Sequence, residues 1–204
     1  ISFAQAITLS DDVAMSSGTG DGTITFSDGI DASSDHAQSL TLTAGTGAIN
    51  FDAAVGATTD LKDITIISAS NVDTDSTLAA KNFIQSAGTG TTQLDGAVTL
   101  SEGLDYNGTH LNINAAVTAG TNVSITNSGT FTTNAAGDIV ASGTFSQDGT
   151  GNSNLSADIT TTNSNISFAQ AITLSDDVAM SSGTGDGTIT FSDGIDASSD
   201  HAQS

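Results

Sequence analysis

Aspartates in short, recurring clusters are the residues of this sequence with the most evident capacity for chemistry. Carboxylates, amide carbonyls and main-chain oxygens at glycine turns are the hard ligands that Ca²⁺ prefers. The clusters therefore predict candidate Ca²⁺ sites, whose ligands would be Asp21, Asp28, Asp31, Asp35, Asp73 and Asp75. The alternative is a solvated acidic surface, whose charge keeps neighbouring molecules apart.

Paired carboxylates could also cleave glycans, because glycosidases place two acids on either side of the scissile bond. The sequence has no Arg to orient a charged sugar, and most of its clustered acids recur within a repeat, whereas a catalytic group tends to be unique. There is no G-x-S-x-G nucleophile elbow, and no Lys follows the GTGDG turn at 18–22 as in a phosphate loop. We therefore expect no enzymatic activity. The acids considered are Asp11, Asp12, Asp28, Asp31 and Asp35, with copies of the last three at Asp193, Asp196 and Asp200.

The three histidines, His36, its copy His201, and His110, form no H-E-x-x-H pattern, and the sequence has no Cys. Neither a zinc motif nor a disulfide scaffold is present. We expect these histidines to be solvated turn residues.

The charge balance excludes two classes of partner. The only basic side chains are Lys62 and Lys81, and the formal net charge is -21. Binding a nucleic-acid backbone needs clustered cations, so we expect no nucleic-acid partner. The same charge would be repelled by anionic lipid, and no stretch approaches the roughly 18 apolar residues of a membrane span, so we expect no membrane insertion.

The composition predicts an all-β protein. There is one Glu and no Pro, and Thr, Ser, Asn, Asp and Gly dominate, which favours strands and turns over helices. High net charge with few aromatics is also typical of disorder. Against disorder, 36% of the residues are hydrophobic, and these residues are regularly placed.

A long repeat sets the domain organisation. Residues 1–39 return without a change at 166–204, which gives a period of 165 residues. We interpret 1–165 as one complete unit and 166–204 as the start of the next. The simplest account is a window from the interior of a longer tandem array, which predicts copies of the unit end to end as partners.

A shorter period lies within the unit. Large apolar residues that follow Gly- or Asn-rich turns recur in steps of 23, 25, 43, 19, 18, 14 and 23 residues. If the step of 43 spans two turns, one unit holds about eight coils of roughly 20 residues, as in a β-solenoid. The step of 14 is short for one coil. The anchors are Phe3, Phe26, Phe51, Leu94, Ile113, Phe131, Phe145 and Phe168.

Strict alternation of apolar and polar residues predicts half-buried strands around these anchors. With a parallel stack of coils, the outward Thr, Ser and Asn would form ladders and the inward residues an apolar core. A string of β-sandwich domains is the competing all-β interpretation and would require hairpins. The alternating pairs are Ile24 and Phe26, Leu40 and Leu42, Ile49 and Phe51, Val98 and Leu100, Leu111 and Ile113, and Val123 and Ile125.

The stretch LTLTAGTGAINFDAAVGATTDLKDITIISASNV at 40–72 resembles the β-strand-repeat surface proteins of bacteria related to filamentous haemagglutinins and autotransporter-type adhesins. In that group an AGTG turn, an I-x-F strand and an A-x-V-G turn recur. The resemblance implies a right-handed parallel β-helix outside the cell.

These features lead to two functional hypotheses. The first is a structural segment of an extracellular fibre, sheath or stalk, which could also have lateral fibre partners. The second is an adhesin whose repeat surface itself binds glycans or partner cells. A glycan site would need exposed aromatic side chains, for which Tyr106 and Phe83 are the candidates.

Overall fold

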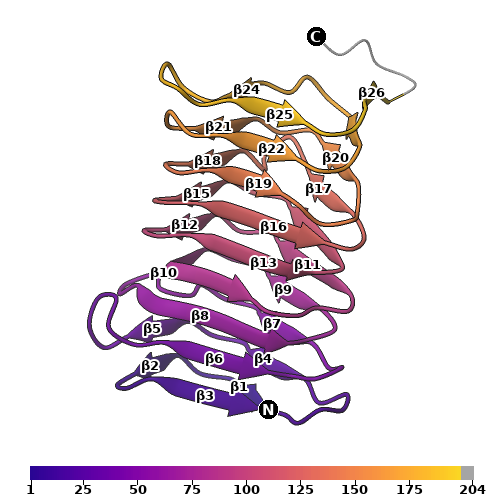
Figure 1. The fold of residues 1–204 in the computed structure, drawn as a ribbon. Coiled ribbons are helices and arrows are strands. Elements are labelled where there is room, and N and C mark those ends of the chain that lie inside the picture. The colour runs from indigo at the N-terminus through magenta and orange to yellow at the C-terminus, as the bar shows by residue number, and fades with distance from the viewer. Residues whose placement is uncertain (199–204) are drawn as a thin grey trace.

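The computed structural model describes residues 1–198, which wind into a parallel β-solenoid of about nine turns (Figure 1). The described residues contain no helix, and all of their strand pairings are parallel. The predicted fold class is therefore confirmed, and the hairpins of a sandwich are not found in this part of the chain. Asp200 and His201 lie outside the described residues.

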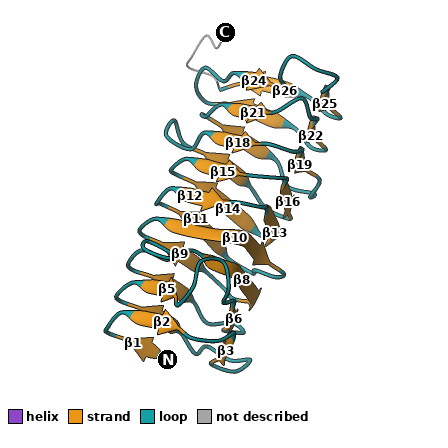
Figure 2. Cartoon of the chain, turned by 90° about the vertical axis from the view of Figure 1, so that its left-hand side faces the viewer, coloured by secondary structure: helices purple, strands orange, loops and turns teal. Residues whose placement is uncertain are grey.

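Each coil passes through three rows of strands, which we call faces 1, 2 and 3 in the order that the chain meets them (Figure 2). Face 1 is a 10-stranded sheet of β1 (Ser2–Phe3), β4 (Ile24–Phe26), β7 (Ile49–Phe51), β9 (Val72–Thr74), β11 (Thr91–Leu94), β14 (His110–Ile113), β17 (Phe131–Thr133), β20 (Ser153–Leu155), β23 (Ile172–Leu174) and β26 (Ile195–Ala197). Face 2 contains β2 (Ile7–Leu9), β5 (Ile30–Ala32), a bridge at Val55, the first half of β10 (Leu78–Gln85), β12 (Val98–Leu100), β15 (Val117–Ala119), β18 (Ile139–Ala141), β21 (Ile159–Thr161) and β24 (Met180–Ser181). Face 3 contains β3 (Val13–Ser16), β6 (Leu40–Thr43), β8 (Leu61–Ser68), the second half of β10, β13 (Leu104–Gly108), β16 (Val123–Asn127), β19 (Phe145–Gln147), β22 (Ile166–Phe168) and β25 (Ile189–Phe191).

The six predicted alternating segments are all strands, and their apolar residues point into the core. The burial pattern of β16, for example, alternates strictly, with Val123 and Ile125 fully buried. Because each coil is covered by the next, an inward residue contacts its counterparts above and below as well as the opposite faces. On face 1 the rings of Phe3, Phe26 and Phe51 stack at centroid distances of 5.4 Å.

The 43-residue step does span two coils, as the sequence predicted. The residue between its two anchors is Thr74, which pairs with Phe51 below and Leu94 above. Thr74 is buried and donates a hydrogen bond from Oγ1 to the carbonyl of Gln93 at 3.2 Å. Because this position holds a polar residue, a search for large apolar anchors does not detect the coil to which it belongs.

The 14-residue step is not a coil. Phe131 lies on face 1 and Phe145 on face 3, so the chain between them passes along two of the three sides. Their true stacking partners are about 22 residues away: Phe131 pairs with Ser153, and Phe145 pairs with Val123. The series of anchors thus moves from one face to another within the 165-residue unit.

Candidate functional site

The six candidate Ca²⁺ ligands are distributed along the solenoid, and several of them hold neighbouring loops. Asp21 Oδ1 accepts a hydrogen bond of 2.6 Å from Thr46 Oγ1 in the next coil. Asp31 Oδ1 accepts the backbone N–H groups of Thr58 and Thr59 at 2.9 and 3.2 Å. These carboxylates connect one coil to the next through bonds that a bound ion would have to share.

Asp28 serves its own turn, because its Oδ1 accepts the N–H of Gly29 at 2.8 Å. Asp35 belongs to a different group, described below. Among the described residues, the only set of three or more His, Cys, Asp or Glu with ligand atoms within 4.8 Å of one another is Asp35, His36 and Asp60. The acids considered for glycan cleavage form no other such set within residues 1–198. Calcium binding by the six acids remains a prediction, and melting curves in Ca²⁺ and in Mg²⁺ plus EGTA at equal ionic strength would test it.

Asp73 lies in an outward column on face 1, between Asn50 below and Gln93 above. Burial raises the pKa of Asp73, and the nearby carboxylates of Asp75 and Asp95 raise it further. Like charges stacked along a ladder disfavour ionisation of the least exposed member. Amide neighbours relieve part of this repulsion, since Gln93 Nε2 donates to Asp95 Oδ2 at 2.7 Å.

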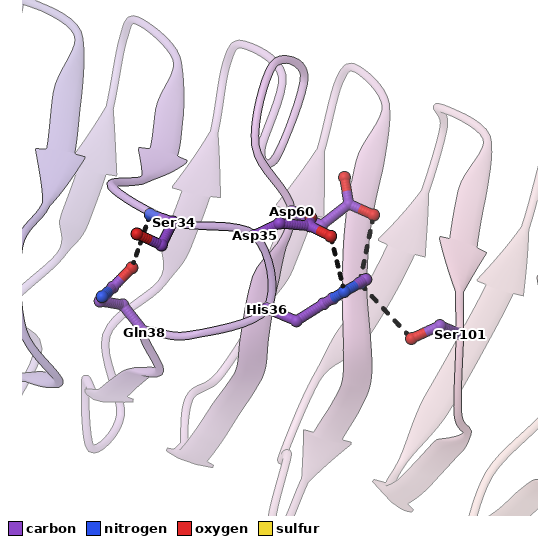
Figure 3. A network of polar contacts seen from close by, with 6 residues as sticks. All are labelled: Ser34, Asp35, His36, Gln38, Asp60 and Ser101. Atoms are coloured by element: carbon purple, nitrogen blue, oxygen red, sulfur yellow. Dashed lines mark hydrogen bonds and ion pairs between the residues drawn. The ribbon is translucent and has the colours of Figure 1, made fainter.

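The Asp35–His36–Asp60 group is built by the loop at 33–39, which joins β5 to β6 (Figure 3). His36 Nδ1 lies 3.1 Å from Asp35 Oδ2, and His36 Nε2 lies 3.3 Å from Asp60 Oδ2. The backbone N–H of His36 also donates to the carbonyl of Asp60 at 2.9 Å. His36 has a φ of 55°, a left-handed conformation that few non-glycine residues adopt.

This group fits a structural clamp better than a metal centre. Both ring nitrogens of His36 face carboxylate oxygens, at 3.1 and 3.3 Å, whereas a metal would need a free lone pair on one nitrogen. His36 Nε2 also lies 3.5 Å from Ser101 Oγ, so the loop extends along the corner between faces 2 and 3. His36 does lie in a turn, as expected, but its side chain is only 22% exposed and contacts two carboxylates.

His110 likewise connects coils. Its Nδ1 accepts the N–H of Thr130 at 2.9 Å and lies 3.0 Å from Thr130 Oγ1. Apart from Asp35, the side-chain partners named for both histidines lie 20 or more residues away in sequence, so only the register of the coils identifies them. His201, the copy of His36, lies outside the described residues.

Polar side chains also line the inside of the corner between faces 3 and 1. Gln85 Oε1 accepts a hydrogen bond from Thr92 Oγ1 at 2.8 Å, and Gln147 Nε2 donates to Asn127 Oδ1 at 2.6 Å. Tyr106 donates from its hydroxyl to the carbonyl of His110 at 2.8 Å. The expected core of Ile, Leu, Val and Phe therefore has a polar edge, in which these side chains bond one another or a main-chain oxygen, while Gln147 Oε1 and Ser153 Oγ are buried without a hydrogen-bond partner among the described residues.

Tyr106 and Phe83 are not exposed aromatics. Each is 1% exposed and points into the core from face 3. Burial raises the pKa of Tyr106 to about 12, partly offset by a hydrogen bond with Thr92. The interpretation of these two rings as candidate receptor contacts is wrong.

A shallow hollow of about 340 Å³ crosses several coils on the outside of the same corner. Small and polar residues line it, including Gly88, Asn107, Ser128 and Asp148. It contains no aromatic ring on which a sugar could stack and no cation that could hold an anionic ligand. Its geometry supports no specific ligand class.

Comparison with known proteins adds no homologue. No family model, curated protein or solved structure matches the chain. No helix among the described residues is long and apolar enough to cross a membrane.

The C-terminal end of the described solenoid presents an apolar surface. Its residues surround a hollow of about 290 Å³ and include Ile189, Phe191 and Ile195, which are 38%, 37% and 45% exposed. In the first copy the identical residues are Ile24, Phe26 and Ile30, and all are at most 1% exposed. There β7 and Val55 of the next coil cover them. This surface therefore has the shape and chemistry of a site for a further coil.

Proposed function

We propose that this chain is a structural segment of an extracellular fibre, sheath or stalk on a bacterial surface. The observation that carries the proposal is the junction between the two copies of the repeat. β22, which begins the second copy, pairs in register with β19 of the first copy, and Phe145 lies beneath Ile166. β23 pairs with β20 in the same way. One unit thus continues the rod of the previous unit without a change of architecture, as a tandem array requires.

The junction has the same bonding as the interior of a unit. The N–H of Ala169 donates to the carbonyl of Gln147 at 2.9 Å, and the N–H of Ser153 donates to the carbonyl of Ala171 at 3.0 Å. Similar main-chain bonds join neighbouring coils along the described solenoid. Pulling along the axis loads these bonds together, so a long array resists extension without any further domain.

The lateral surface suits a rod that remains separate from its neighbours. The net charge is -21 with only two basic side chains, so parallel rods repel each other at moderate ionic strength. Away from the two ends of the described solenoid, the exposed large hydrophobics are Ile67 and Val140. The sides of the rod therefore offer little apolar area to further copies of this chain.

The structural hypothesis is favoured over the adhesin hypothesis by the position of the aromatic rings. Tyr106 and Phe83 are buried, and the hollow of about 340 Å³ on the outside of the corner between faces 3 and 1 has no aromatic lining. The extracellular and bacterial parts of the proposal are supported by the resemblance of residues 40–72 to bacterial surface repeats, and by the lack of a cation cluster for nucleic acid.

Immunogold electron microscopy tests this proposal. Antibodies raised against residues 1–165 are applied to intact and to permeabilised cells that make the protein. The proposal expects gold particles along thin filaments or a sheath outside intact cells. Labelling that appears only after permeabilisation, or that marks isolated particles, would overturn it.

A further inference from the structure

Identical sequences lie on different faces of this solenoid. β1 begins the first copy on face 1, whereas β22, which has the same sequence, lies on face 3. The second strand moves in the same way, since β2 lies on face 2 and its copy β23 on face 1.

The copies keep the same internal register in spite of this change of face. Phe3 pairs with Phe26 in the first copy, and Phe168 pairs with Phe191 in the second. The ring centroids of these pairs are 5.4 and 5.9 Å apart, and both pairs are stacked. The second copy is therefore the same local structure turned about the solenoid axis.

The turn follows from the length of the unit. From β1 to β22 the chain completes seven coils and then passes two of the three faces, so the unit ends one face short of eight coils. The step of 14 residues from Phe131 to Phe145 is an example of such a passage, because the chain moves in it from face 1 to face 3. A whole number of coils would have returned the second copy to face 1.

The three faces accept the same strand because they offer it the same environment. Each face presents two inward positions per three-residue strand, above two inward positions of the coil below. Phe168 lies over Gln147 and beneath Phe191 on face 3, and its counterpart Phe3 lies beneath Phe26 on face 1.

We propose that in a tandem array each unit is turned by one face, about a third of a revolution, relative to the unit before it. This inference rests on the proposed function, because it describes how successive units are joined. Any surface feature then appears on all three sides in succession and returns to its first face after three units, which contain 23 coils. At about 4.8 Å per coil this superperiod is roughly 110 Å.

The turn determines how the rod meets its neighbours. A feature such as the loop at 33–39 would form a single row on one side if units held whole numbers of coils. With the turn, the rod has no unique side, and partners that are further copies of this chain meet equivalent surfaces in three directions. This arrangement favours single filaments or bundles over flat, one-sided sheets.

Cysteine cross-linking on the intact chain tests the inference, because the sequence has no Cys of its own. Outward residues that pair between neighbouring coils lie about 4.8 Å apart, so cysteines at these positions should be linked by a short reagent with two thiol-reactive groups, such as a bis-methanethiosulfonate. The positive control is S124C/S146C, a pair within the first unit on face 3. The junction pair is S146C/S167C, which are also register partners. The decisive pair is T132C/S146C, which would be neighbours only if the 14-residue step were a coil.

We expect S146C/S167C to cross-link as completely as the control, and T132C/S146C to remain unlinked. A cross-link between T132C and S146C would overturn the one-face turn and leave the continuous rod intact. If the control forms and S146C/S167C does not, the second copy does not continue the solenoid, and the inference fails together with the structural basis of the proposed function.

Discussion

The two copies of the repeat allow the same core substitution to be made in two different environments and its cost compared. Phe26 and Phe191 occupy the same position of identical sequences. Phe26 is 1% exposed and stacks between Phe3 and Phe51, whereas Phe191 is 37% exposed and stacks on Phe168 alone. The variants Phe26→Ala and Phe191→Ala therefore remove the same side chain from a closed and from an open environment.

The expected costs follow from these environments. Replacing a fully buried Phe by Ala costs about 3–5 kcal/mol, because the lost transfer free energy adds to that of a cavity which the neighbours cannot fill. At Phe191 more than a third of the side chain is already exposed, and the space left behind is open to water, so no closed cavity forms. Scaling the transfer term alone by the buried fraction gives a cost of about 1–2 kcal/mol.

Urea unfolding followed by far-UV circular dichroism measures both costs. Effects of the substitution on the unfolded state largely cancel when the two losses in free energy of unfolding are compared, because the neighbouring residues in sequence are the same at both positions. We expect the free energy of unfolding to fall at least twice as much for Phe26→Ala as for Phe191→Ala. Equal losses would show that Phe26 is not covered by a further coil, and would refute the stacking on which the assignment of the coils depends.

Three further outcomes follow from the structure. Tyr106 is the only tyrosine in a chain without Trp, so its ionisation can be followed by phenolate absorbance. It should ionise near pH 12 in the folded protein and near pH 10 in urea. A midpoint near pH 10 in the folded protein would contradict its burial. Because the pKa of Asp73 is raised by folding, its carboxylate destabilises the fold above that pKa, and the penalty disappears as the pH falls through it. Asp73→Asn should therefore stabilise the protein by roughly 0.5 kcal/mol at pH 7 and not at low pH, and a gain that is the same at every pH would argue against the charge repulsion. Gly151→Ala should strongly lower the melting temperature, since the added Cβ would lie 1.4 Å from the carbonyl oxygen of Gly129. Gly20→Ala should change the melting temperature little, because a Cβ there would have no other atom within 4 Å.

The fold could be predicted from the sequence because a solenoid repeats a simple local pattern. Alternation such as that of Ile49, Asn50 and Phe51 identifies a strand with one buried face without knowledge of its partners. The 165-residue repeat and the spacing of the anchors then gave about eight coils per unit, which agrees with the structure.

The features that could not be predicted depend on the register between coils. Asp60 meets His36 because a loop of one coil folds over the corner of the next, and nothing in their spacing of 24 residues indicates this contact. Thr74 and Gln147 occupy core positions where Thr74 Oγ1 and Gln147 Nε2 find partners, so a search for apolar anchors does not detect them. The scarcity of aromatic residues predicts Tyr106 as an exposed receptor contact, but its alternation with Leu104 within β13 indicates burial.

The contour length of engineered tandem arrays tests the central claim most directly. Arrays of two, four and eight copies of residues 1–165 would be imaged by atomic force microscopy. Because each unit adds seven and two-thirds coils at about 4.8 Å per coil, we predict unbranched rods whose length grows by roughly 37 Å per unit at constant width. Beads on a string, a width that grows with copy number, or an increment far from this value would contradict the account.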